Sequence, residues 1–211
     1  MDDVQSIIID CGSYCTKAGF SGEWSPRSVF RTVISTSHGD FHFGSTINAY
    51  IGDDAYKKPS LSLRCPIDHG IVTNWNDMEQ IIHYIYDNQL RITPENHPVV
   101  FSELATNTKA NREKLLQIML ETFKVPSYYV GNQNVFAVYG TKRTTGLSCD
   151  IGDSVTSIVP VYEGYSIQGA FKTIDLGGSD ITNRLQQLLN ENGNNFVSKD
   201  EKEIVYDIKE N

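Results

Sequence analysis

Asp10-Cys11-Gly12-Ser13-Tyr14-Cys15-Thr16 follows the apolar run Ile7-Ile8-Ile9, and the same pattern returns 140 positions later as Asp150-Ile151-Gly152-Asp153-Ser154-Val155-Thr156. In both copies a strand-like run ends in Asp-x-Gly, and a second strand-like run follows. Asp and Gly are residues that form turns, so each copy predicts a β-hairpin. Two matched hairpins indicate a duplicated unit whose two loops face each other.

The residue types in these loops suit a phosphate chain. Gly12 and Gly152 allow the backbone to approach a ligand closely, and the N–H groups that follow can form an anion-binding nest. Ser13 adds a hydroxyl donor, and Lys17 supplies positive charge for terminal phosphates. Nucleotide binding is therefore our first hypothesis.

The two aspartates of the motif need a cation if a triphosphate lies between them. Asp10 and Asp150 would otherwise repel the phosphates, whereas Mg²⁺ keeps several water ligands that these carboxylates could hold. The alternative is that both copies are ordinary Asp-Gly hairpins. Because matched loops follow matched strands, we favour the metal–phosphate interpretation.

Two further features lie near the second copy. Gln133 precedes it, and a Gln amide can orient a water molecule for in-line attack on a phosphate, although a structural role is also open. The Gly-rich turn from Asp175 to Asp180 leads into a predicted helix. Its N–H groups could face a nucleotide, or it could be a simple strand-to-helix turn.

Composition restricts the classes of function. The net charge of −8 over 211 residues predicts no dominant basic surface, so we expect no direct nucleic-acid binding. No apolar run reaches the length of a membrane-spanning helix, and the acidic start Met-Asp-Asp lacks the features of a signal peptide. The four cysteines show no CxxC pairing, so we expect reduced thiols and a chain in the cytoplasm or nucleus.

The apolar periodicity predicts strands and helices in an order that repeats, which indicates an α/β protein with two related halves. We expect strands at 6–10, 16–20, 29–34, 99–104, 128–130, 147–151, 155–161 and 165–171. We expect helices from a cap at Asn76, over 109–123, around 133–139, after a cap at Ser179, and from Ser198 or Asp200 to the last residue.

Several longer strings resemble the actin and actin-related protein family: Lys17-Ala18-Gly19-Phe20, Pro66-Ile67-Asp68-His69-Gly70-Ile71-Val72-Thr73-Asn74-Trp75, Lys109-Ala110-Asn111-Arg112-Glu113-Lys114, Arg143-Thr144-Thr145-Gly146, Tyr162-Glu163-Gly164-Tyr165 and Asp207-Ile208-Lys209-Glu210. They occur in family order along the whole chain. The resemblance covers all of this chain but only a little over half of a conventional actin.

The resemblance implies the actin-like ATPase fold, a ribonuclease H-like duplicated βββαβα unit, here truncated in its second half. On that pattern residues 1–28 and 66–140 form the first large subdomain, and residues 29–65 form a small outer subdomain. Residues 141–176 form part of the second large subdomain, and 177–211 begin the second small one. We expect unpaired sheet edges and apolar helix faces in the second half.

The resemblance also implies ATP with Mg²⁺ or Ca²⁺ as cofactors, bound in a cleft between the halves and with the metal held mainly through water. Asp10 and Asp150 match the metal carboxylates, and Gln133 with Asp150 matches the catalytic positions. Lys209 and Glu210 match positions that contact the base and ribose, and His69 matches a histidine that many actins methylate. The phosphate clamp corresponds to Gly12, Ser13, Tyr14, Lys17, Gly152, Asp153, Ser154 and Val155.

The chain also departs from the family pattern. Tyr14 and Ser154 stand where the loops of conventional actin have glycine, and a side chain at Tyr14 would be costly if φ were positive there. Ser157 replaces a histidine that helps to position the attacking water, and Tyr206 replaces an arginine near the base. The insertion at 35–46, with His38 and His42 as expected solvated loop residues, diverges from the family's filament contact loop and leaves self-assembly open.

The first function that we predict is an actin-like cytoskeletal protein that binds ATP, hydrolyses it slowly and associates with filaments. Its partners would be actin or other cytoskeletal proteins, with no membrane. The alternative is a truncated, non-catalytic actin-related paralogue or complex subunit with little nucleotide function. A small-molecule kinase on the same fold is disfavoured by the actin-specific strings. A change in melting temperature with Mg-ATP would separate the first two hypotheses.

Overall fold

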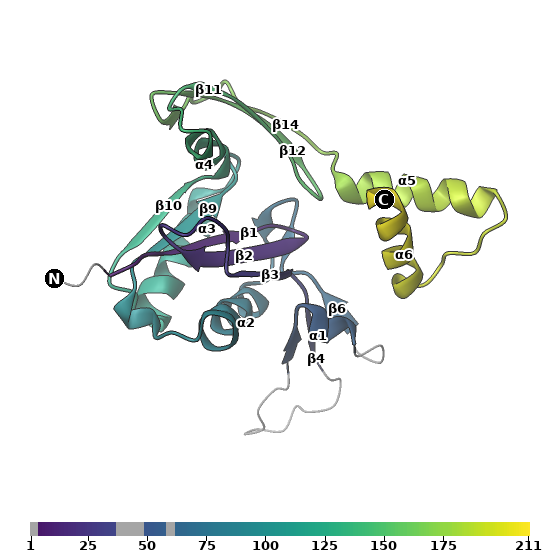
Figure 1. Ribbon diagram of the computed structural model, residues 1–211, viewed down its shortest axis with the longest axis horizontal. Helices are drawn as coiled ribbons and strands as arrows, with labels where there is room; N and C mark the ends of the chain where they lie inside the picture. The colour runs from purple at the N-terminus through teal and green to yellow at the C-terminus, as the bar shows by residue number, and fades with distance from the viewer. Residues whose placement is uncertain (1–3, 37–48, 58–61) are drawn as a thin grey trace.

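The computed structural model in Figure 1 describes residues 4–36, 49–57 and 62–211. The predicted loop histidines His38 and His42, and most of the divergent insertion, lie outside the described residues. The described chain forms four sheets, of which two carry the Asp-x-Gly hairpins.

The first of these sheets has five strands in the order β10-β9-β1-β2-β3. Its strands are β1 (Ile7–Cys11), β2 (Cys15–Phe20), β3 (Ser28–Arg31), β9 (Val99–Glu103) and β10 (Tyr128–Asn132). The first three form an antiparallel meander, whereas β9 and β10 run parallel to β1. The carboxyl ends of β1, β9 and β10 therefore meet at one edge, where polar residues follow the apolar runs.

Two helices pack against this sheet. Helix α2 (Trp75–Tyr84) continues as a π-helical segment, η1 (Ile85–Leu90), and α3 (Lys109–Gln117) continues as η3 (Ile118–Thr122). A short 3-10 turn, η2 (Pro94–Asn96), precedes β9. The core between helices and sheet contains fully buried side chains from both, among them Ile7, Ile9, Met78, Ile81, Ile82, Phe101 and Met119.

The cap of α2 differs from the sequence prediction. The N-cap is Asn74 rather than Asn76, and its side chain accepts a hydrogen bond from the N–H of Asp77 at 3.1 Å. Asp77 is buried, and its carboxylate receives both Nε and Nη2 of Arg64, each at 2.9 Å. The Asn74 amide also donates to the Asp77 carboxylate at 3.0 Å, so Asn74 and Asp77 bond each other at the start of the helix, two residues before the predicted cap.

The strand predicted over 29–34 is two strands in different sheets. β3 ends at Arg31, and β4 (Ile34–Thr36) pairs with β5 (Ala49–Ile51) and β6 (Ser62–Arg64). Between them the N–H of Val33 bonds the carbonyl of Arg31 at 2.9 Å, which turns the chain out of the first sheet. Helix α1 (Asp53–Tyr56) follows β5, and the short hairpin of β7 (Ile67–Asp68) and β8 (Ile71–Val72) follows β6.

The second hairpin-bearing sheet contains β11 (Gly146–Ile151), β12 (Thr156–Tyr162), β13 (Tyr165–Ser166) and β14 (Lys172–Ile174). Helix α4 (Gln133–Gly140) packs on it through Val135 and Val138, which meet Val159 and Val161. The turn between β12 and β13 has φ of 47° at Glu163 and 86° at Gly164. Positive φ at both positions is the geometry of a two-residue hairpin turn.

Two helices complete the described chain, α5 (Gly178–Glu191) and α6 (Lys199–Glu210), which contact each other and are seen together at one end of the molecule in Figure 1. Ser198 caps α6 as predicted, and Glu201 completes the capping box. α5 instead begins at Gly178, because the Asp180 carboxylate accepts from the N–H of Gly177 at 2.8 Å and so fixes the N-cap before Ser179.

The second half exposes many large apolar side chains, as the sequence predicted. Those at least 39% exposed in the strands and helices from β11 onward include Leu147, Ile151, Ile174, Ile181, Leu188 and Ile208. None of the helices in the described residues combines the length and the apolar character that crossing a bilayer would require.

Candidate functional site

The two Asp-x-Gly segments fold into hairpins with the same register. Asp10 pairs with Lys17 across β1 and β2, and Asp150 pairs with Ser157 across β11 and β12. In the first turn the Gly12 N–H bonds the Cys15 carbonyl at 3.0 Å, and in the second the Gly152 N–H bonds Val155 at the same distance. A Cβ on Gly12 or Gly152 would lie 3.1 or 3.0 Å from those carbonyl oxygens, which explains why both turns use glycine.

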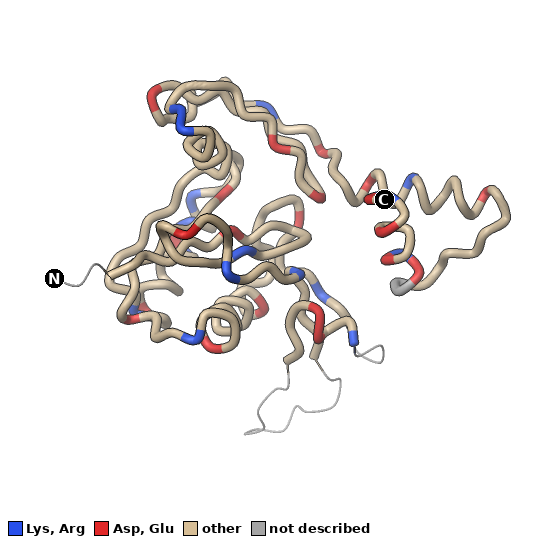
Figure 2. Tube along the Cα trace, in the orientation of Figure 1, with Lys and Arg blue, Asp and Glu red and all other residues tan. Residues whose placement is uncertain are grey.

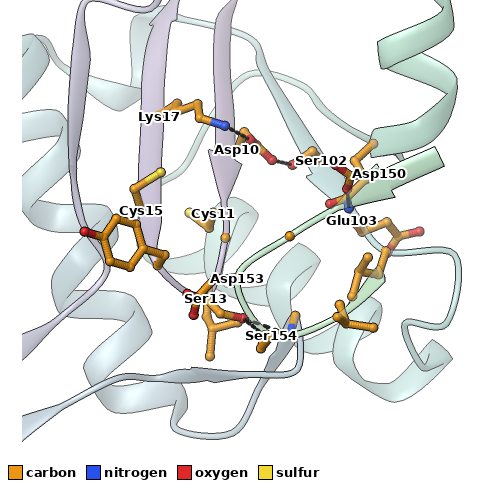
Figure 3. Close-up of a pocket in the computed structure, with 18 of the residues that line it drawn as sticks. Asp10, Cys11, Ser13, Cys15, Lys17, Ser102, Glu103, Asp150, Asp153 and Ser154 are labelled. Atoms are coloured by element: carbon orange, nitrogen blue, oxygen red, sulfur yellow. Dashed lines mark hydrogen bonds and ion pairs between the residues drawn. The ribbon is translucent and has the colours of Figure 1, made fainter. Parts of the chain in front are cut away.

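The tips of the two hairpins meet. The hydroxyl of Ser154 donates to Ser13 Oγ at 2.8 Å, as Figure 3 shows, and the N–H of Gly70 donates to the same Ser13 oxygen at 3.1 Å. The prediction that the loops face each other is confirmed. Ser13 accepts two hydrogen bonds, so its own O–H stays available as a donor.

The loops border a pocket of about 820 Å³. All the residues that the sequence assigned to metal, phosphate, catalytic and base contacts line it: Asp10, Gly12, Ser13, Tyr14, Lys17, Gln133, Asp150, Gly152, Asp153, Ser154, Val155, Lys209 and Glu210. Its volume is in the range of small-molecule and cofactor sites. The structure thus brings these positions together, while the role of each stays a prediction.

Asp10 is held at the strand edge by two neighbours. Lys17 Nζ lies 3.3 Å from its Oδ2, and the Ser102 hydroxyl bonds its Oδ1 (Figure 3). Burial lowers the pKa of Lys17, but the combined charges of Asp10, Cys15 and Asp150 and its hydrogen bond to Asp10 raise that pKa above its ordinary value. Lys17 therefore stays protonated and places a positive charge beside Asp10 at the pocket.

Asp150 faces Asp10 from the second hairpin and is tied to the first residue of α4. Gln133 Nε2 donates to Asp150 Oδ2 at 2.6 Å. Asn132 caps this helix by accepting from the N–H of Asn134 at 2.8 Å, which fixes Gln133 at the pocket wall. The Gln133 amide thus orients the carboxylate with its N–H and keeps its carbonyl oxygen as a possible acceptor.

The Gly-rich turn before α5 supports the second loop with its backbone. The Gly178 N–H bonds the Gly152 carbonyl at 2.9 Å, and the Ser179 N–H bonds the Asp153 carbonyl at 2.7 Å. A Cβ on Gly177 would lie 2.3 Å from that Asp153 oxygen. Of the two interpretations left open by the sequence, these contacts favour the structural turn, because the loop occupies the donors.

Tyr14, the bulky residue in the first loop, does not strain the backbone through a positive φ. The described non-glycine residues with positive φ are His69, Arg91, Lys124, Lys142 and Glu163, and Tyr14 is outside this set. Its ring stacks on Tyr206 with centroids 4.8 Å apart and 18° between the planes. Two residues that depart from the family pattern thus contact each other.

Sequence reasoning missed several polar residues behind the site. Ser102 and Glu103 end β9 beside Asp10, a position that the parallel pairing of β9 with β1 could have indicated. Asn134 is fully buried, donates to Ser148 Oγ at 3.1 Å and accepts from Ser157 Oγ at 3.1 Å. Through this network Ser157 anchors α4 on the second sheet. The position of Ser157 opposite Asp150 in the hairpin does not by itself reveal this role.

The donor set restricts how a cation could bind. Among the described residues, no group of three or more His, Cys, Asp or Glu side chains is placed to hold a metal ion. The four cysteines are free thiols, and burial raises the pKa of Cys11 to about 12. A hard cation at Asp10 and Asp150 would therefore need water or other oxygen atoms for its remaining ligands.

Comparison with known proteins agrees with this geometry. The family model described as Actin matches residues 1–210. The chain belongs to the actin family. The chain is also 43% identical to "Putative actin-29" of Dictyostelium discoideum, in an alignment of 211 positions that covers 97% of this chain and 54% of that protein. This actin-family chain therefore has a mixed α/β fold of the actin type and spans about half the length of that relative.

Proposed function

We propose that this actin-family chain binds ATP together with a divalent cation, Mg²⁺ or Ca²⁺, between its two Asp-x-Gly loops. The observation that carries this proposal is the contact of the two loop tips through Ser13 and Ser154 beside a pocket that both Asp10 and Asp150 line. A carboxylate on each side of one pocket would repel phosphates unless a cation screens the charge.

The side chains around the loops have the donors that a triphosphate needs. The Ser13 O–H is free to donate, and Lys17 contributes a positive charge. The backbone that follows Gly12 and Gly152 supplies N–H groups at the tips of both hairpins. Lys209 and Glu210 line the pocket on α6, where the base and ribose would lie.

Slow hydrolysis of ATP is the finer part of this proposal. The bound cation would neutralise charge on the phosphates, and Gln133 would accept a hydrogen bond from the attacking water through its carbonyl oxygen. The hydrogen bond from Gln133 to Asp150 supports this role because it fixes the amide. Asp150 would hold metal-bound water at the same time.

The family also suggests partners and a location. Association with actin or other cytoskeletal proteins in the cytoplasm is the corresponding proposal, and co-sedimentation of the purified chain with actin filaments tests it. A second candidate function is partner binding with little nucleotide function. The observation that favours it is the exposed apolar surface of α5 and α6, which includes Ile181, Leu188 and Ile208.

Thermal unfolding of the purified chain with ATP tests the proposal. We expect Mg-ATP to stabilise the folded chain by about 2.7 kcal/mol at a hundredfold excess over its dissociation constant. Asp10→Asn should lose most of the additional stabilisation that Mg²⁺ gives. It should keep the stabilisation by ATP that is measured in EDTA. Asp87→Asn, on η1 and away from the pocket lining, is the matched control. If ATP leaves the melting temperature of the wild-type chain unchanged with and without Mg²⁺, the proposal is wrong and the partner-binding candidate is favoured.

A further inference from the structure

Arg31 is the centre of a cluster that joins the first sheet to the last helix. It lies at the end of β3, and its guanidinium forms an ion pair with Glu203 of α6. The same guanidinium lies over three rings, 4.7 Å from the centroid of Tyr14, 4.9 Å from Tyr56 and 5.8 Å from Tyr206. We call Tyr14, Arg31, Tyr56, Glu203 and Tyr206 the ring clamp.

The clamp connects segments that are distant in sequence. Tyr14, Arg31 and Tyr56 come from the first loop, β3 and α1, whereas Glu203 and Tyr206 lie one turn apart on α6. Figure 2 shows that acidic positions recur along α6, the helix that carries Glu203. The clamp is thus a direct contact between the two sides of the pocket.

The ion pair at the centre of the clamp is partly buried. The side chains of Arg31 and Glu203 are only 22% and 31% exposed, so water screens their attraction less than at a free surface. A planar guanidinium can pair with a carboxylate and stack on aromatic faces at once. The stacked rings of Tyr14 and Tyr206 shield this pair further.

The clamp also borders the proposed nucleotide site. Tyr14 directly follows Ser13 in the phosphate loop, and both Tyr14 and Tyr206 line the pocket. Lys209 Nζ lies 4.3 Å from the Tyr206 centroid and donates to the Gly178 carbonyl at 3.2 Å. α6 is therefore linked to the first loop through Tyr206 and to the turn that supports the second loop through Lys209.

We propose that the ring clamp is a latch that holds α6 against the first phosphate loop without nucleotide, and that its opening limits the rate at which nucleotide enters and leaves. The contacts that carry it are all between side chains of this chain. The rate-limiting part rests on the proposed ATP binding, whereas the existence of the latch does not.

Hydrogen–deuterium exchange of the nucleotide-free chain tests whether the latch exists. Glu203→Gln removes one charge with almost no change of shape, and Tyr206→Leu removes the stacked ring. Both should speed amide exchange in residues 199–210 and in the loop at 12–15 by roughly fivefold or more. Asp207→Asn removes a charge from an exposed position on the same helix, outside the clamp, so it should exchange at the wild-type rate.

Dissociation of a fluorescent ATP analogue tests the rate-limiting part. The analogue should dissociate from Glu203→Gln and Tyr206→Leu at least roughly fivefold faster than from the wild-type chain and Asp207→Asn.

Equal amide-exchange rates in Glu203→Gln, Tyr206→Leu and Asp207→Asn would overturn the latch. Faster amide exchange with unchanged dissociation would overturn the rate-limiting role alone. If the analogue binds neither the wild-type chain nor any variant, the proposed function and the rate-limiting role fail together, and amide exchange still decides whether the latch exists.

Discussion

The hydroxyls of Ser13 and Ser154 are 2.8 Å apart although the residues are 141 positions apart in the chain. Each serine lies at the tip of one Asp-x-Gly hairpin, so this single hydrogen bond joins the two copies of the repeat. Ser13 Oγ also accepts from the Gly70 N–H at 3.1 Å, whereas Ser154 contributes only its donor to this contact. Ser13 therefore takes part in two hydrogen bonds at this contact and Ser154 in one.

Alanine substitution should expose this asymmetry. Ser154→Ala removes one hydrogen bond, so we expect the free energy of unfolding to fall by about 1 kcal/mol. Ser13→Ala also leaves the Gly70 N–H unpaired, so its cost should be larger, about 2 kcal/mol. Urea denaturation of both single variants and the double variant measures the coupling, and strictly additive losses would contradict the contact.

Asp150→Asn should distinguish binding of the metal from binding of the phosphates. The Asn side chain can still accept from Gln133, so the fold should survive, but it lacks the charge that a divalent cation requires. We expect Mg-ATP affinity to fall about tenfold or more, and affinity for ATP in EDTA to stay equal or rise because a repulsive charge is gone. Isothermal titration under both conditions measures this, and an equal loss in both would rule out a metal role for Asp150.

The sequence predicted the hairpins and their meeting because the signals there are local. Asp and Gly at a strand end specify a tight turn, and the register follows once the turn is placed. The repeat then implied that two such turns belong to related halves, and Ser13 and Ser154 lie where that implication puts them. Similarly, the Ser198 cap of α6 needed only its own neighbours.

The features that the sequence did not reveal depend on distant partners. The strand predicted over 29–34 divides because the chain changes sheets at Val33. The contact of Tyr14 with Tyr206 could not be inferred from either residue alone. In these places packing between elements overrides the local pattern.

Gly177→Ala should damage the second loop although it replaces no residue of the predicted phosphate clamp. The added Cβ would lie 2.3 Å from the Asp153 carbonyl oxygen, a backbone atom that cannot move without shifting the loop. We expect a loss of at least about 2 kcal/mol in the free energy of unfolding. Gly140→Ala is the control, because no atom lies within 4 Å of its added Cβ at the end of α4, and it should be neutral or stabilising. Equal stabilities of the two variants would refute the close contact.

His69 should make stability depend on pH through its two carboxylate neighbours. Its Nδ1 lies 2.8 Å from Asp68 and its Nε2 lies 2.7 Å from Asp175. The hydrogen bond to Asp68, the charges of Asp175 and Asp68 and a smaller contribution from Asp180 raise the pKa of His69 above its ordinary value of 6.5. Because the folded pKa is the higher one, the stabilisation is complete below pH 6.5 and is lost as pH rises through the folded pKa. NMR titration should show His69 titrating above 6.5, and the pKa of His69 should fall in Asp175→Asn. A His69 that titrates at or below 6.5, or one that is unaffected by Asp175→Asn, would contradict the ion pair between the two halves.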